Sequence, residues 1–230
     1  QNIFSRESRG RDVSELLRDF PGREYEKGDL VFRPGKAENN VYYVEEGKIL
    51  LYRHHFVFDK EMVLGLFMQG EFINPDIVSI DPGTHRYAVV RSPSVIRAIP
   101  KLSFFSLMVQ NRALVRKVQQ GLVQRQSDTL RHLHNMELMS TRQRILYYLV
   151  EYTEKAGQDA GYEKVVRHFL THRELGGLCN ASRQSVTTVL NQLRQMGLIH
   201  FNRRYLLVRD LEKLREMALT AHLGRQTTAS

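Results

Sequence analysis

The chain has few of the residues and patterns that define several large classes of protein. Its 230 residues include one cysteine, Cys179, and no tryptophan. A single thiol excludes an internal disulfide and any iron–sulfur cluster held by four thiolates of this chain. No apolar run approaches the roughly 20 residues that a membrane-spanning helix needs, and no secretory signal is recognisable. We therefore expect a cytoplasmic protein that has no membrane partner.

The motifs of common enzymes are also missing. The sequence contains no G-x-S-x-G, no H-E-x-x-H, no P-loop and no paired-cysteine metal site. His132 and His134 are two residues apart on an expected helix, so their side chains lie on different faces and make a poor metal pair. These absences predict that the chain is not an enzyme.

What the chain has in excess is positive charge. Its formal net charge is +9 and its isoelectric point is about 9.8. Such a balance favours a polyanionic partner, because basic side chains release the counterions of a phosphate backbone. The length fits two modest domains, each large enough to bury a core.

Residues 171–208 predict a device that places one helix in the major groove of DNA. Thr171 is a good helix N-cap, and Glu174 completes a capping box with it. After a short helix and a tight turn, Ser182 is a second N-cap. Apolar side chains recur at helical spacing over residues 183–196, while the first turns of this helix carry polar groups that suit base edges and phosphates.

A hairpin follows the second helix. Residues 198–201 and 205–208 predict two short strands around a basic turn. Two capped helices and such a hairpin indicate a winged helix-turn-helix, although a plain helical hairpin packed on a small sheet is the structural alternative. The residues that we expect to contact DNA are Thr171, His172, Ser182, Arg183, Gln184, Ser185, Thr187, Thr188, Asn202 and Arg203.

The first half has the pattern of a β-structure. Between residues 25 and 100, short apolar runs alternate with turn residues about every 8 to 12 positions, which is typical of an all-β roll or sandwich. The expected strands contain residues 30–32, 41–44, 49–52, 62–67, 87–90 and 95–99.

The pattern becomes helical from residue 102, and a long helix is expected over residues 109–139. Five of its residues follow the 4-3-4-3 spacing of a coiled-coil seam, which predicts a dimer. A helix that only covers the roll is the alternative. We expect a break at Thr141 and Arg142, then a helix over residues 143–156. The seam residues are Leu122, Gln126, Thr129, Leu133 and Met136.

This order of parts resembles the CRP/FNR superfamily of bacterial transcription regulators. The resemblance covers about residues 23–215, and its most specific segments are residues 28–35 (GDLVFRPG), 41–48 (VYYVEEGK), 70–73 (GEFI) and 170–193. The helix pair is most similar to that of the haem-based carbon monoxide sensors of the superfamily. The resemblance implies an α+β chain with an N-terminal jelly roll at residues 1–108, a dimerisation helix at 109–139 and a winged helix-turn-helix at 140–230.

The resemblance also implies roles at the DNA end. Arg183 matches the family arginine that reads guanine, and its fork suits the O6/N7 pair. Gln184 stands where many members have a glutamate that accepts from cytosine, so the usual half-site does not follow for this chain. Thr188 replaces a family arginine or serine and predicts a shorter contact.

The effector end departs from the family pattern. Members that bind cyclic AMP have a Gly-Glu-Leu run where this chain has Asn74, Pro75 and Asp76. Arg86 is kept, but Tyr87 replaces a small hydroxyl residue, so cyclic AMP is not the expected effector. The candidate effector-binding residues are Phe72, Asn74, Arg86, Tyr87, Gln126, Thr129 and Leu130.

The cofactor is not fixed by the sequence. Haem needs an axial ligand, and His54, His55 and His85 are candidates that are also ordinary turn residues. We expect an effector-modulated regulator that binds double-stranded DNA as a homodimer on a palindromic site, with RNA polymerase as a further partner. A haem-based carbon monoxide or nitric oxide sensor, an apolar or aromatic effector, and a cyclic-nucleotide-binding protein that does not act on DNA are the alternatives.

Overall fold

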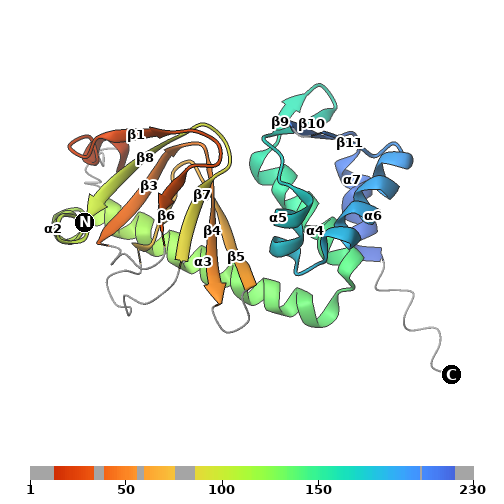
Figure 1. Cartoon of the computed structure of the whole chain (residues 1–230), viewed down its shortest axis with the longest axis horizontal. Coiled ribbons are helices and arrows are strands. Elements are labelled where there is room, and N and C mark those ends of the chain that lie inside the picture. Colours follow the sequence, from red (N-terminus) through yellow and green to blue (C-terminus); the bar gives the residue numbers. More distant parts are fainter. Residues whose placement is uncertain (1–12, 34–38, 56–59, 76–85, 203, 221–230) are drawn as a thin grey trace, which may run out of the picture. The chain divides into compact units, whose positions relative to one another are not determined.

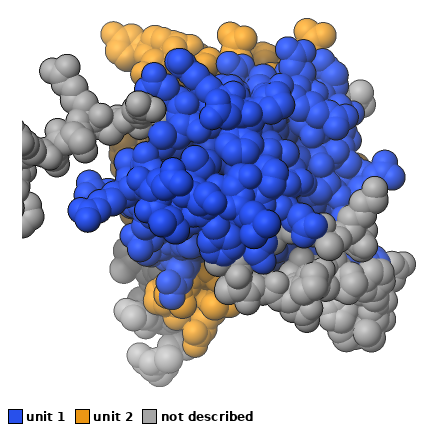
Figure 2. Space-filling model, turned by 90° about the vertical axis from the view of Figure 1, so that its left-hand side faces the viewer, with its two compact units in different colours: residues 1–128 blue, residues 129–230 orange. Residues whose placement is uncertain are grey.

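The computed structural model describes residues 13–33, 39–55, 60–75, 86–202 and 204–220, which Figure 1 draws as coloured ribbon. The chain divides into two compact units, residues 1–128 and 129–230, which Figure 2 shows in different colours. The boundary falls inside the long helix α3 (Arg112–Leu138). The expected α+β class, with a β-roll, a long helix and a helix-turn-helix, is confirmed.

The first unit contains two four-stranded antiparallel sheets (Figure 1). One has the strand order β1-β8-β3-β6 and the other β2-β7-β4-β5. Strands β1 and β6 were not predicted from the sequence, since both are short and β1 is largely exposed. The strands are β1 (Gly22–Tyr25), β2 (Leu30–Phe32), β3 (Asn40–Glu46), β4 (Lys48–His55), β5 (Lys60–Met68), β6 (Phe72–Ile73), β7 (Arg86–Val90) and β8 (Ser94–Pro100).

Strand β3 explains how the two cores of this unit arise. Its run of four apolar residues is buried throughout, and successive side chains of a strand point to opposite faces. Tyr42 and Val44 pack between the sheets, where the Tyr42 ring stacks on Phe32 at 5.0 Å. Val41 and Tyr43 pack on the other face, against residues from three helices. A continuous apolar strand is therefore the sign of a sheet covered on both sides.

The helices of the first unit are α1 (Val13–Leu16), α2 (Lys101–Gln110) and the N-terminal part of α3. The expected helix over residues 109–139 starts later than predicted. Asn111 lies between α2 and α3 in an extended conformation, and its Oδ1 accepts a hydrogen bond from the Leu114 N–H at 3.0 Å. This side-chain cap ends one helix and starts the next.

The described part of the second unit combines the end of α3 and the helices α4 to α7 with a four-stranded antiparallel sheet of order β11-β12-β10-β9 (Figure 1). Helices α4 and α6 turn apolar faces inward, and α7 packs on α4. The elements are α4 (Thr141–Ala156), β9 (Gln158–Ala160), β10 (Glu163–Arg167), α5 (His172–Cys179), α6 (Arg183–Gln195), β11 (Ile199–Phe201), β12 (Tyr205–Val208) and α7 (Leu211–Thr220).

One sequence-based expectation in this unit is corrected, and two of its strands were not predicted. The break predicted at Thr141 and Arg142 is wrong, because both residues lie inside α4. The helix begins at Thr141, after a capping box in which Ser140 and Gln143 exchange side-chain and backbone hydrogen bonds. Strands β9 and β10 were not predicted, since β9 is exposed throughout and β10 has little apolar alternation. Their register comes from pairing with each other and with β12.

Candidate nucleic-acid interface and effector cavity

The N-terminus of α6 presents polar side chains to solvent. Ser182 caps the helix, and its hydroxyl oxygen accepts a hydrogen bond from the Ser185 N–H at 3.0 Å. Arg183, Gln184 and Thr188 are exposed. The opposite face of the helix is buried through Val186, Val189, Leu190 and Leu193. Packing therefore fixes the helix while its first two turns project polar groups outward.

The turn before α6 depends on two unusual backbone positions. Asn180 adopts a left-handed conformation, with φ +48°, which ends α5. Gly176 faces this turn so closely that a Cβ there would lie 2.6 Å from the Ala181 carbonyl oxygen. Thr171 and Glu174 form the capping box that the sequence predicts. The angle between the two helices is thus set by caps and by a close backbone approach.

Two of the predicted DNA contacts also bind each other. The Thr187 hydroxyl donates to the Arg183 carbonyl oxygen at 2.9 Å, so its oxygen accepts a hydrogen bond from His172 Nδ1 at 2.8 Å. The His172 ring also meets the Phe201 ring edge-on at 5.7 Å. Burial, and to a smaller degree Arg183, lowers the pKa of His172. A neutral His172 therefore ties α5 to α6 and to the hairpin.

The hairpin β11–β12 is held by a side chain at its tip. Asn202 Oδ1 accepts hydrogen bonds from the N–H groups of Arg204, at 2.7 Å, and Tyr205, at 3.0 Å. The Arg194 guanidinium lies over the Phe201 ring at 5.4 Å, which links α6 to β11. Asn202 thus shapes the predicted DNA-contacting turn, whereas Arg203 lies outside the described residues.

Arg144 on α4 binds three backbone carbonyl oxygens of the second unit. Its guanidinium donates to the carbonyl oxygens of Met139 at 2.9 Å, Cys179 at 3.0 Å and Asn180 at 2.8 Å. These carbonyls belong to the end of α3 and to the turn between α5 and α6. One planar fork therefore fixes the last residues of the long helix against the turn that positions α6. The sequence alone predicts no role for this residue.

Cys179 has the buried position that its place in the apolar pattern suggests. It is 2% exposed, and burial raises the pKa of its thiol to about 12, against a smaller opposite effect of Arg144. Only about one thiol in ten thousand is then ionised at pH 8. We expect a thiol reagent such as DTNB to label native protein at pH 8 far more slowly than urea-unfolded protein. Equal labelling rates in the two states would contradict this burial.

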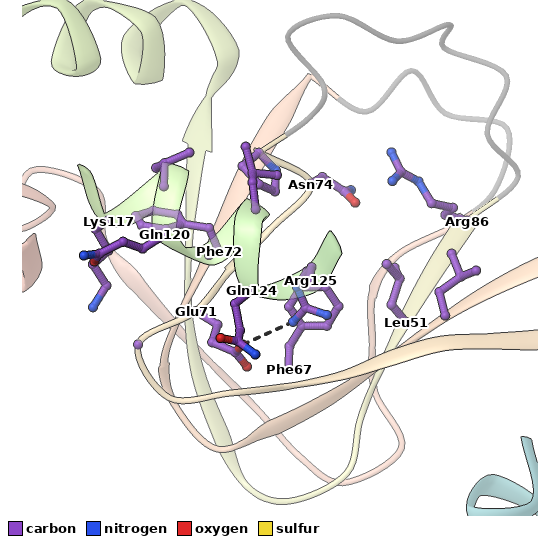
Figure 3. A pocket seen from close by; sticks show the side chains of 16 residues that line it. Leu51, Phe67, Glu71, Phe72, Asn74, Arg86, Lys117, Gln120, Gln124 and Arg125 are labelled. Carbon is purple, nitrogen blue, oxygen red and sulfur yellow. Dashed lines mark hydrogen bonds and ion pairs between the residues drawn. The ribbon is translucent and has the colours of Figure 1, made fainter. Parts of the chain in front are cut away.

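The first unit contains a cavity of ≈ 570 Å³ between its roll and α3 (Figure 3). Its apolar lining includes Leu51, Phe67 and Phe72, and its charged lining groups are Arg86, Lys117 and Arg125 against one carboxylate, Glu71. Figure 3 shows Arg125 and Glu71 side by side, with Lys117 and Arg86 on opposite sides of them. The cavity has the size and the apolar character of a small-molecule site.

The cavity contains some of the predicted effector residues and excludes others. Phe72, Asn74 and Arg86 line it. Tyr87 does not; it stacks on Tyr52 with ring centroids 5.0 Å apart. Neighbours on a strand face opposite sides of the sheet, so the same strand cannot point both Arg86 and Tyr87 into one cavity. Tyr87 therefore does not line this cavity, and a role in binding an effector stays a prediction.

The remaining predicted effector and seam residues lie on α3. Gln126 is exposed and does not line the cavity, while Thr129 and Leu130 belong to the second unit. Met136 Sδ accepts a hydrogen bond from Asn180 Nδ2 at 3.0 Å, so this seam residue contacts the turn before α6. The seam residues Leu122 and Leu133 stay 40% and 51% exposed in the single chain.

The residues of the cavity do not fit haem. Haem iron needs an axial ligand such as His, Cys or Met. None of the described residues that line the cavity is of these types. His54 lies on β4 and is half-buried; His85 and the side chain of His55 lie outside the described residues. Across the described ranges, no three His, Cys, Asp or Glu side chains are grouped to hold a metal ion.

None of the seven α3 residues that line the cavity was predicted to bind an effector. They include Lys117, Gly121 and Arg125, and the sequence gives no sign of which helix face meets the roll. The sequence pattern that could have indicated them is a lysine and an arginine eight residues apart in a long helix, with a glycine midway between them.

Within the described residues, no helix is long and apolar enough to cross a membrane.

A capped helix pair with a hairpin, preceded by a β-roll, defines a class of DNA-binding proteins. Residues 143–217 match the model of the Crp-like helix-turn-helix domain, and residues 22–111 match that of the cyclic nucleotide-binding domain. The chain belongs to the CRP/FNR family, and it is a CRP-like DNA-binding transcription regulator. Regulators of this family are not enzymes, which confirms that expectation.

Known relatives cover nearly the whole chain. It is 25% identical over 208 residues to the cyclic AMP receptor protein of Thermus thermophilus, which covers 90% of this chain and 92% of that protein. It is 25% identical over 195 residues to the CRP-like protein Clp of Xanthomonas campestris, at 82% and 84% coverage. A CooA mutant from Carboxydothermus hydrogenoformans has a similar fold, with a TM-score of 0.70, 22% identity and coverage of 88% and 89%.

Proposed function

We propose that two copies of this chain bind a palindromic DNA site and that a small molecule in the cavity of the first unit controls this binding. The observation that carries the proposal is the exposure of Arg183 and Gln184 at the capped start of a buried helix. Such a helix end suits the major groove, and two-fold symmetric proteins place two of them on half-sites one helical turn apart.

The proposed dimer contact is α3. Its exposed apolar side chains include Leu122, Leu130 and Leu133, which are 40–61% exposed in the single chain. Helices that carry such residues at heptad-like spacing bury them by pairing. Gln126 and Thr129 would be polar positions within this seam and would set its register. We keep residues 109–139 as the dimerisation segment between a sensor at 1–108 and a reader at 140–230, with RNA polymerase as an expected partner.

The proposed DNA contacts fall into two groups. Arg183, Gln184 and Thr188 would read base edges, and Thr171, Ser182, Ser185 and the hairpin tip would meet phosphates. His172 and Thr187 are hydrogen-bonded to each other, so they would already hold α6 in position when they come to contact DNA. The hydroxyls of Ser182 and Ser185 lie 2.9 Å apart, so one phosphate oxygen could bind both.

The cavity supports an effector other than cyclic AMP. Asn74 and Pro75 line it where the family resemblance implies the ribose-holding glutamate, and Tyr87 points elsewhere. The cyclic AMP receptor protein and the c-di-GMP responsive regulator CLP bind the ligands in their names, and neither ligand follows for this chain at such identities. Haem lacks a fitting ligand residue among the described residues of the cavity, so gas sensing is not our proposal.

DNA selection tests this function and gives a first prediction for Gln184. Full-length protein should enrich a two-fold symmetric site from random duplexes at about 150 mM salt, where non-specific binding is weak. A Gln side chain can bind adenine bidentately, whereas Glu accepts from cytosine. We therefore expect Gln184→Glu to move the preference at one position of each half-site from adenine to cytosine. Enrichment of no symmetric site would overturn the proposal.

The matched control for that variant is Gln195→Glu, which makes the same change at the exposed C-terminal end of α6. It should leave the selected sequence unchanged, because the end of the helix lies about 16 Å along its axis from Gln184 at 1.5 Å per residue. An unchanged preference in Gln184→Glu would mean that this residue does not read a base.

A further inference from the structure

The hydrogen bonds of His172 fix the position of its ring hydrogen. His172 is half-buried at the start of α5, next to the cap residue Thr171. Its Nδ1 lies 2.8 Å from the Thr187 hydroxyl oxygen, and that hydroxyl already donates its one hydrogen to the Arg183 carbonyl oxygen at 2.9 Å. Thr187 can therefore only accept from the ring, so Nδ1 carries a hydrogen. In the neutral ring this leaves a bare lone pair on Nε2.

Nε2 is the open end of this ring. Among the described residues it makes no hydrogen bond, and it is not one of the buried polar atoms, so it reaches solvent. The ring itself is held edge-on to Phe201, with centroids 5.7 Å apart. One nitrogen is thus fixed by the protein, while the other is available to a partner that approaches the starts of α5 and α6.

A DNA phosphate cannot bind a bare nitrogen. Phosphate oxygens accept hydrogen bonds and do not donate them, so a neutral His172 would place one lone pair against another. The protonated ring would donate from Nε2 and keep its Nδ1–H bond to Thr187. Addition of a proton is therefore the one change that makes this side chain a phosphate ligand without moving it.

The surroundings of His172 in the free chain oppose this proton. Burial, and to a smaller degree the charge of Arg183, lowers the pKa of His172. Cations outnumber acids among the neighbouring side chains, so a phosphate beside the ring would supply the anion that favours its charged form. The charged and titratable residues of the segments next to His172 are Arg167 and His168 before α5, Arg173 and Glu174 on α5, Arg183 and Arg194 on α6, and His200 on β11.

The acids near α5 are engaged elsewhere. Glu174 accepts a hydrogen bond from the Thr171 N–H at 2.8 Å. Helix α4 also packs on α5, but its Glu151 pairs with Arg131 at 3.1 Å and its Glu154 pairs with Arg215. Within the described residues, no carboxylate raises the pKa of His172. A phosphate of DNA would therefore be the first anion to act on the ring.

We propose that His172 of each copy takes up one proton from solvent when the chain binds DNA, and that Nε2 then donates to a backbone phosphate. The inference rests on the proposed function, because it concerns the same DNA-binding surface. Since binding takes up protons, the affinity for DNA must rise as the pH falls, until the free chain is protonated as well. This contact reads no base, so it should operate on DNA of any sequence.

Binding of the full-length protein to a random-sequence duplex measures this linkage without a known operator. From about pH 8 to about pH 6 at constant salt, the affinity should rise at least about tenfold. The salt dependence should steepen by about one unit of log affinity per log salt for each copy, because one more phosphate is neutralised. An affinity that stays constant, or that falls towards the lower pH, would overturn the inference.

Two substitutions of His172 separate the proton from the position. Asparagine can still donate to Thr187 but does not titrate, so His172→Asn should change its affinity less than about twofold over the same pH range. Arginine is charged at every pH, so His172→Arg should bind at about pH 8 as tightly as the unaltered chain does at about pH 6. A pH dependence that survives in His172→Asn would place the proton on another group and contradict the inference.

The matched controls are His132→Asn and His200→Asn. His132 lies on α3, and burial and Arg144 lower its pKa too. His200 is exposed on β11, with its ring 6.0 Å from that of Tyr205. Both variants should keep the pH dependence of the unaltered chain. If either of them loses it, that histidine takes up the proton and the assignment to His172 is wrong.

Nitrogen NMR of the histidine rings gives a readout that a purely structural role would not change. The signals of His172 are those that disappear in His172→Asn. In the free chain at neutral pH they should show a hydrogen on Nδ1 and a bare Nε2, and the ring should titrate below the usual range of histidine. Binding of the duplex should move this titration upward. An unchanged titration in the complex would overturn the inference.

DNA selection at the same two pH values distinguishes this inference from the proposed function. A symmetric site that is selected and bound equally well at both values would overturn proton uptake alone. If no symmetric site is selected while the affinity for random duplex still depends on His172 and pH, the palindromic function is overturned and the proton-linked phosphate contact is supported.

Discussion

Arg183→Ala should remove most of the sequence preference of this protein while leaving its general affinity for DNA nearly intact. Arg183 is exposed at the first position of α6, and a guanidinium there can bind both acceptors of a guanine in the major groove. A bidentate contact of this kind contributes about 1–3 kcal/mol of discrimination, so each half-site should lose roughly 5- to 150-fold. The measurement is competition binding of the selected site against random duplex, followed by a new selection.

The control for charge is Arg215→Ala. Arg215 lies on α7 and pairs with Glu154 and Glu212, so this variant removes the same charge from a face that holds no predicted DNA contact. Arg215→Ala should leave the affinity for random DNA almost unchanged and Arg183→Ala should lose at most one phosphate contact, since non-specific binding depends on the number of phosphates that basic side chains neutralise. Equal loss of specific binding in the two variants would mean that Arg183 acts only as a charge. A guanine still selected by Arg183→Ala would lead to the same conclusion.

The sequence predicts the reader unit well because its determinants are local. Thr171, Glu174 and Ser182 act within three residues of their partners, so the caps can be found without knowing the fold. The start of α4 was misplaced by a residue or two although it is just as local. Ser140 and Gln143 form a capping box there, but the polar pair Thr141 and Arg142 that it encloses has the pattern of a break.

The fold class of the sensor unit can be predicted from the sequence, but the side chains that line its cavity cannot. Alternation and turn spacing indicate a roll, yet they do not tell which face of a strand meets α3. Arg86 and Tyr87 are both candidate effector residues in the sequence, whereas strand alternation directs only Arg86 into the cavity. Arg125 could not be found either, because its seat on Phe67 and Gly65 joins residues that are about sixty positions apart in the sequence.

The hydrogen bonds of Arg144 have a further consequence for the reader unit. Arg144→Met keeps the apolar stem but removes every donor, so the carbonyls of Met139, Cys179 and Asn180 lose a charged partner. Hydrogen bonds to charged groups contribute about 1.5–3 kcal/mol each, and water can replace part of this at a half-buried site. We therefore expect the free energy of unfolding of residues 129–230 to fall by about 2–4 kcal/mol.

Hydrogen exchange shows where that loss falls and separates a positioning role from general stability. In Arg144→Met, exchange should rise first in the turn around Asn180 and at the end of α3, before the core of α4 opens. Arg144→Lys should recover less than half of the loss, because a single ammonium group cannot reach three carbonyls as a planar fork does. Arg131→Met, which removes a partly exposed pair with Glu151 on the same two helices, should cost only about 0–1 kcal/mol. If Arg144→Met exchanged like the unaltered chain while still selecting its DNA site, α6 would be positioned by its caps and core alone. The link from the end of α3 to the α5–α6 turn would then have no role in the regulator.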